Sequence, residues 1–187
     1  LGGLLHAWEP DHIAAVTTFV TQSPSRRDAW VYGLRWGLGH ALAVLVTGLA
    51  AAAVGMAIPE VATRVLEIAV GCVLVGLGLR ALLRWRAPAG DGQGATWVGV
   101  LHGLAGSAPL IAVLPAALLG SLGAAALYLT LFGVGTLGGM ALYAALAGRL
   151  ARHLHDRLPR AAVALRTAAG VLAVAVGSVW LWTAWRG

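Results

Sequence analysis

The long uncharged tracts of this chain constrain its fold more than any other feature. Residues 36–59, 68–79, 97–148 and 167–185 contain no Asp, Glu, Lys or Arg. A helix that crosses a bilayer needs about 20 apolar residues, so the third tract has room for two. Only 11% of all residues are charged, whereas a soluble domain carries about 25% and uses them to cover its solvated surface. The chain is therefore predicted to be an all-α protein embedded in a lipid bilayer.

Six membrane-spanning helices are predicted from these tracts. We place them at residues 1–21, 33–58, 61–83, 96–119, 123–147 and 161–185. The Gly-rich segment 87–95 is predicted to be a linker, and a short turn at Gly120 and Ser121 separates the fourth and fifth spans. Because Leu1 already lies in apolar sequence, we expect further residues upstream.

The arginines predict the orientation in the membrane. Eleven of the 13 lie in or beside the loops after spans one, three and five, and only Arg64 and Arg186 lie on the other side. Loops rich in Arg and Lys stay in the cytoplasm, so these three loops are predicted to be cytoplasmic in a multi-pass protein of the cell's inner (plasma) membrane. The formal charge of +6 does not indicate nucleic-acid binding, because the arginines lie at the ends of apolar tracts rather than on a polar face.

The segment 148–159 is predicted to be an amphipathic stretch at the inner interface. Leucines recur every four residues in it, with Arg and Asp between them. His153 and His155 in this stretch are interpreted as interfacial polar residues, with metal binding as the alternative.

A shift of 96 residues aligns the two halves of the chain. It places residues 3–7 on residues 99–103, and residues 36–40 on residues 132–136. In the third span the shift drifts to 99 or 100, which pairs Gly71 with Gly170. Each half has three spans, so the halves insert with opposite orientation, as is typical of secondary transporters. We predict a single transmembrane domain over 1–187, built as an inverted 3+3 repeat with half one at 1–86, a linker at 87–95 and half two at 96–187.

The first span contains the polar string of residues 6–12, HAWEPDH. Ionisable groups within a membrane are expensive to bury and by default indicate a functional site. Pro10 lacks an N–H, so the carbonyl of His6 loses its helical partner and the helix is predicted to be interrupted there. The break lets His6, Asp11 and His12 converge as metal ligands; Asp11 binds the ion directly or holds a histidine. Glu9 is an accessory ligand, or it reaches outer water.

The second and fourth spans carry further candidates. His102 lies at the repeat-related position of His6, and the glycines and proline after it predict that the fourth span is also interrupted. His40 in the second span is predicted to be a ligand or a gate, and His102 a ligand or a structural hydrogen-bonding residue. Ser107 and Thr136 are accessory candidates, or they bond to helical backbone. Tyr32, Tyr128 and most of the tryptophans fit an interfacial aromatic belt.

Imidazole with carboxylate predicts a borderline transition metal. Nickel, cobalt, zinc and iron suit these ligands, whereas magnesium and calcium prefer oxygen and copper(I) prefers sulfur. The chain has one cysteine, Cys72, and two isolated methionines, which we interpret as packing residues.

The motifs resemble a known superfamily. The string from His6 to His12 resembles the H-x4-D-H signature of the nickel/cobalt transporter superfamily, and residues 38–40 (LGH) resemble its second motif. Residues 102–107 and 131–140 are more similar to the urease-accessory membrane branch, grouped near the sulfite-exporter-type proteins. The resemblance implies nickel or cobalt binding at His6, Asp11 and His12, with His40 in the second-motif role. The acidic fifth-span motif of uptake permeases and the His-rich loop of the efflux branch are both absent from this sequence.

Together these patterns favour a secondary transporter of a divalent transition-metal ion, most simply nickel or cobalt, which is the transported substrate rather than a cofactor. The chain has no phosphate-binding G-x-x-x-x-G-K-[ST] loop, so we do not expect it to hydrolyse ATP itself. A homo-oligomer is compatible with the sequence. Three alternatives stay open: a sulfite-type anion transporter, an intramembrane hydrolase or metalloenzyme, and a membrane partner that delivers metal without transporting it. We expect no enzyme, because the H-E-x-x-H motif is absent. The carboxylates of the first span repel anions, which argues against the sulfite-type transporter.

Overall fold

The structure is a bundle of helices. The computed structural model describes residues 1–22, 26–54, 59–83, 93–105 and 108–186, and these contain no strand, which confirms the all-α class for this part of the chain. The elements are α1 (Gly2–His6), α2 (Pro10–Val20), α3 (Arg26–Val54), α4 (Glu60–Leu82), α5 (Gln93–Leu104), the π-helix η1 (Pro109–Val113), α6 (Leu114–Leu118), α7 (Leu122–Arg157) and α8 (Pro159–Arg186).

Four helices are long and apolar enough to cross a membrane: Asp28–Val54, Glu60–Leu82, Leu122–Arg157 and Pro159–Arg186. Their outer faces carry aliphatic side chains; Val46, Val61 and Val134 are 65%, 75% and 63% exposed. Such a surface is stable in lipid, where every backbone polar group is satisfied within its own helix. The chain is thus a membrane protein with four candidate spanning helices, and the predicted first and fourth spans are shorter, broken segments.

The first segment breaks as Pro10 predicts. Helix α1 ends at His6, Glu9 adopts an extended backbone (φ −66°, ψ 152°), and α2 begins with Pro10 in its first turn. Proline suits this position because its missing N–H would be unpaired at a helix start anyway. The His6 carbonyl does not stay unpaired, since the Glu9 N–H donates to it at 3.1 Å.

The fourth segment is irregular as well. Helix α5 ends at Leu104, and the chain continues through the π-helix η1, which has wider turns than an α-helix. The hydroxyl of Tyr128 donates to the carbonyl of Ile111 in η1 at 2.7 Å, so a helix of the bundle satisfies part of this irregular backbone.

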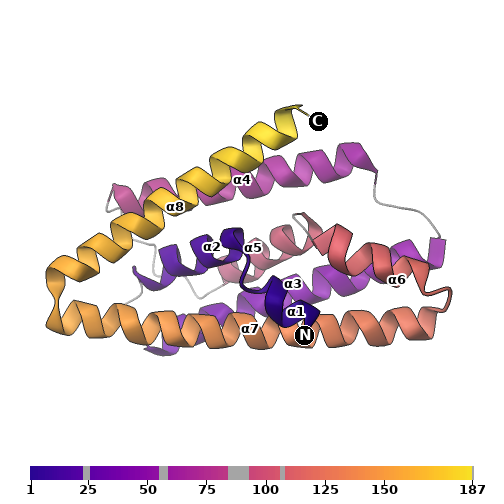
Figure 1. Ribbon diagram of the computed structural model, residues 1–187, viewed down its shortest axis with the longest axis horizontal. Coiled ribbons are helices and arrows are strands. Elements are labelled where there is room, and N and C mark those ends of the chain that lie inside the picture. Colours follow the sequence, from indigo (N-terminus) through magenta and orange to yellow (C-terminus); the bar gives the residue numbers. More distant parts are fainter. Residues whose placement is uncertain (23–25, 55–58, 84–92, 106–107, 187) are drawn as a thin grey trace.

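The helices form two long pairs with the broken segments between them. Helices α3 and α7 pack along each other, as do α4 and α8, and α2 and α5 lie between these pairs (Figure 1). Helix α1 packs on α7, and α5 packs on α3. Glycines permit these close approaches: a Cβ on Gly3 would collide with the Phe132 carbonyl, and one on Gly99 with the Trp36 carbonyl. Both contacts fix α1 and α5 against the middle of a long helix.

Some predicted boundaries differ from the structure. Helix α7 runs through Arg157 without a break, so the amphipathic stretch at 148–159 is largely its last turns rather than a separate segment. Helix α5 begins at Gln93, so the end of the predicted linker is helical, and residues 84–92 lie outside the described part. The predicted turn is present: Gly120 has φ +65°, and the Ser121 hydroxyl accepts from Ala124 N–H at the start of α7.

Candidate metal centre

Three histidines converge at the break in the first segment. His6 ends α1, His12 lies in the first turn of α2, and His40 lies midway along α3. One ligand nitrogen from each falls within 4.8 Å of the others. The side chains are 2%, 1% and 0% exposed, and Nε2 of His6 is 3.1 Å from Nε2 of His40. Sequence spacing placed His6 and His12 near each other, and His40 was predicted separately as a ligand or a gate. In the fold α2 contacts α3, and the ring of His6 reaches that of His40.

Two carboxylates hold two of the imidazoles. Oδ1 of Asp11 lies 3.1 Å from Nδ1 of His12, and Oε1 of Glu9 lies 3.1 Å from Nδ1 of His6. A carboxylate only accepts, so each facing Nδ1 carries the proton and each Nε2 keeps its lone pair. Nε2 of His12 is buried with no hydrogen-bond partner among the described residues. Carboxylate, imidazole and metal follow one another in this order in many metal sites, where the carboxylate fixes the ring orientation.

The two carboxylates form a second group of possible metal ligands together with His12. Ligand atoms of Glu9, Asp11 and His12 lie within 4.8 Å of one another, and the Glu9 side chain is 31% exposed while Asp11 and His12 are buried. The acidic side of the centre is therefore the side that is open to its surroundings.

Glycines bring α5 against the centre. A Cβ on Gly39 would collide with the Thr96 carbonyl, and a Cβ on Gly103 would lie 2.6 Å from the His40 carbonyl. The backbones of α3 and α5 therefore touch on both sides of His40. Small residues at a helix interface allow this distance of approach in membranes.

His102 lies beside the three histidines but outside their 4.8 Å group. Its Nδ1–H donates to the Val98 carbonyl one turn earlier, at 2.9 Å. Its Nε2 is then an acceptor, buried and without a partner among the described residues. The ring centroid of His102 is 5.6 Å from that of His12. Both readings of His102 from the sequence, ligand and hydrogen-bonding residue, are compatible with this geometry.

Trp36 is a residue of the centre that the sequence did not single out. It is fully buried, and its ring stacks on His12 with an interplanar angle of 26° and a centroid distance of 5.5 Å. The interfacial belt was assigned to Tyr32, Tyr128 and most of the tryptophans without naming Trp36; that assignment is wrong for Tyr32, which is buried as well. The signal that could have found Trp36 is its place one helical turn before His40, on the same face of α3.

The accessory candidates differ in their surroundings. Thr136 is buried, and its hydroxyl donates to the Phe132 carbonyl at 3.0 Å, as the backbone-bonding interpretation expects. Ser107 lies outside the described residues.

Comparison with known proteins identifies the family. No family model matches the chain, and no solved structure matches it. The urease accessory protein UreH of Bacillus sp. (strain TB-90) is 31% identical over 166 residues, covering 78% of this chain and 72% of that protein. The chain belongs to the UreH family, of the nickel/cobalt transporter type.

This UreH-family chain is a membrane protein with four candidate spanning helices among its described residues. The resemblance seen in the first-span motif is thereby confirmed at the level of the family. His6 and His12 of the centre lie in that motif, and His40 comes from α3.

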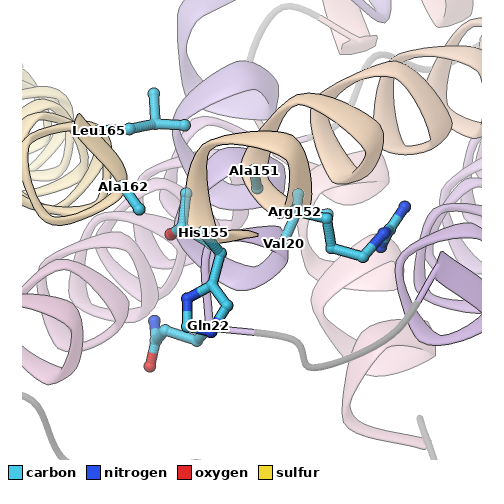
Figure 2. Close-up of a pocket in the computed structure, with 8 residues that line it drawn as sticks. Val20, Gln22, Ala151, Arg152, His155, Ala162 and Leu165 are labelled. Carbon is cyan, nitrogen blue, oxygen red and sulfur yellow. The ribbon is translucent and has the colours of Figure 1, made fainter. Parts of the chain in front are cut away.

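A separate cavity of about 280 Å³ lies at the other end of α2 in this UreH-family chain. Figure 2 shows His155 of α7 beside Gln22 at its mouth. Its walls come from the end of α2, the last turns of α7 and the start of α8: Val20, Thr21, Gln22, Ala151, Arg152, His155, Ala162 and Leu165. Val20 is eight residues from His12, roughly 12 Å along the helix, so the cavity is not part of the metal centre.

Proposed function

We propose that this chain carries nickel or cobalt ions across a membrane and that His6, His12 and His40 bind the ion through Nε2. The observation that carries the proposal is the convergence of these three buried imidazoles at a broken membrane segment. Ligand sites at interrupted helices are typical of secondary transporters. The relationship to a urease accessory protein supports nickel as the first choice.

The spacing of the nitrogens fits a shared ion. Imidazole nitrogens lie about 2.1 Å from a bound divalent ion such as zinc, so two neighbouring ligands are separated by roughly 3 Å. The 3.1 Å between Nε2 of His6 and Nε2 of His40 is of this size, and without an ion it is a hydrogen bond between the rings. Imidazole ligands favour nickel, cobalt and zinc over magnesium and calcium.

Asp11 acts on the ion through His12. Its carboxylate holds Nδ1 of His12 and so aims Nε2 at the ion. Glu9 serves His6 in the same way and is the more exposed of the two carboxylates. A hydrated cation that approaches from this side meets negative charge first.

An inverted repeat supports alternating access to this centre. Contacts recur at the 96-residue shift with the halves exchanged: Gly3 meets Phe132 as Gly99 meets Trp36. Likewise, the ring of His6 lies 5.3 Å from that of Phe132, and the ring of His102 lies 5.2 Å from that of Trp36. In this proposal the broken first and fourth segments complete six spans, with loops after spans one, three and five in the cytoplasm.

Transport of metal by purified protein tests the proposal. Proteoliposomes with wild type, His6→Ala and His12→Ala are compared for uptake of nickel, cobalt, zinc and manganese, with His153→Ala as control because His153 is exposed on α7. Saturable nickel or cobalt flux that is lost in both centre variants and kept in the control is expected. Flux of sulfite instead would favour the anion transporter, and metal binding without flux would favour a metal-delivery partner.

A further inference from the structure

Two buried polar atoms next to the metal centre have no partner in the described part of the chain: Nε1 of Trp36 and Nε2 of His102. Their side chains are 0% and 2% exposed. Leaving a polar atom unpaired at such a depth is unfavourable, so a guest that satisfies both atoms is favoured.

Both side chains lie at the interface between α3 and α5. A Cβ on Gly99 would lie 2.5 Å from Cδ1 of Trp36, the ring carbon bonded to Nε1. The polar edge of the indole therefore packs on α5 at Gly99, three residues before His102 and on the same helical face. The ring of His102 stands nearly perpendicular to the indole at an angle of 80° and 5.2 Å away.

The chemistry of the two atoms restricts the guest. The indole nitrogen has an N–H and no lone pair to offer, so it donates only. Nε2 of His102 accepts, because Nδ1 donates its proton to the Val98 carbonyl. A bare metal ion fits His102 but is repelled by the Trp36 N–H. A water molecule accepts one hydrogen bond and donates another, so it fits both.

His12 connects this pair to the ion. Its ring lies 5.5 Å from that of Trp36 and 5.6 Å from that of His102, and its own Nε2 is the unpaired ligand atom. We infer that the ion is bound as an aqua complex, with three imidazoles from His6, His12 and His40 and one retained water held by Trp36 and His102. His102 is then a positioning residue rather than a ligand. This inference rests on the proposed metal site.

Counting imidazole ligands distinguishes the two roles of His102. X-ray absorption of the purified full chain loaded with Co²⁺ is expected to show three imidazoles and an oxygen ligand in wild type. The number of imidazole ligands is expected to stay at three in His102→Leu. It is expected to fall to two in His40→Gln, and this control shows that the method detects the loss of a single imidazole. Four imidazoles in wild type that fall to three in His102→Leu would overturn the inference and leave the proposed function standing.

A double-mutant cycle tests the shared water. Trp36→Phe and His102→Leu are each expected to weaken Co²⁺ binding about 5–30-fold, as for one lost buried hydrogen bond. His102→Gln keeps an acceptor and is expected to restore most of the affinity. The double variant should bind about as well as either single variant, because both act on one water. Additive losses of Co²⁺ affinity in the double variant would overturn the inference, as would losses no larger than in the control Trp185→Phe. If the wild type does not bind Co²⁺ at all, the proposed function is overturned as well.

Discussion

At the scale of single residues, the chemistry of the centre depends on which nitrogen of each histidine carries the proton. Asp11 and Glu9 occupy Nδ1 of His12 and His6, and Val98 occupies Nδ1 of His102. Nε2 of His6, His12 and His102 therefore keeps its lone pair, and these rings lie in one buried region. Without an ion, the Nε2–H of His40 donates to Nε2 of His6, and His40 has to move this proton to bind through Nε2. A hydrogen bond to one nitrogen of a neutral imidazole determines the chemistry of the other.

Removing the charge of Asp11 tests this arrangement. Asp11→Asn keeps the size of the side chain but weakens the acceptor for Nδ1 of His12, so the ring loses its fixed tautomer. Loss of such an orienting partner typically costs 10–100-fold in metal affinity. We expect nickel binding by calorimetry to weaken by this factor, with three imidazole ligands retained. The control is Asp156→Asn on the exposed end of α7; a loss of one oxygen ligand in Asp11→Asn would instead make Asp11 a direct ligand.

At the scale of helices, the break at Pro10 could be predicted because a missing N–H has a local consequence that any sequence shows. The role of Trp36 was missed. Its spacing from His40 shows that the two residues share a face of α3, but only the packing of α5 on α3 shows that this face is turned to the interior rather than to lipid. The length of α7 was also missed. Backbone hydrogen bonds of a helix continue through turns that carry charged side chains. The polar residues 148–157 therefore indicate where α7 leaves the apolar environment, and not where the helix ends.

Glycine contacts on α5 give a prediction at this scale. In Gly99→Ala the new methyl group collides with the Trp36 carbonyl, which is backbone and cannot rotate away. We expect a loss of about 1–3 kcal/mol in stability, as for overpacked cores, together with weaker nickel binding. The repeat-related Gly3→Ala should behave alike, because it collides with the Phe132 carbonyl.

The matched control lies on the same helix. A Cβ on Gly94 meets nothing within 4 Å, so Gly94→Ala adds a methyl group without a clash. Thermal unfolding in detergent should place this variant at or above wild type, since Ala is the better helix former. Equal unfolding temperatures for all three variants would show that the close approach of α5 to α3 is not needed.

At the scale of the whole molecule, the two halves have related backbone contacts but different potential metal ligands. Gly3 and Gly99 make related contacts, yet the first half supplies His6, His12 and His40, and the second half supplies His102. Thr136 stands at the position related to His40, with its hydroxyl bonded to its own helix. The ion is therefore expected to be held by the first half, while the second half shapes the site around it.

The orientation of α8 in the membrane is the last prediction. On a Cys72→Ala background, which removes the single cysteine, one new cysteine is placed at His155 and another at Trp185, both of them exposed. The arginine distribution puts His155 in the cytoplasm and Trp185 outside. A membrane-impermeant maleimide should label Trp185→Cys in intact cells, and His155→Cys only after the membrane is opened. His155 lies in the last turn of α7, just before α8 begins. Labelling of both from outside would place the two ends of α8 on one face of the membrane, which contradicts α8 as a spanning helix. The reverse pattern would keep the spans and invert the orientation.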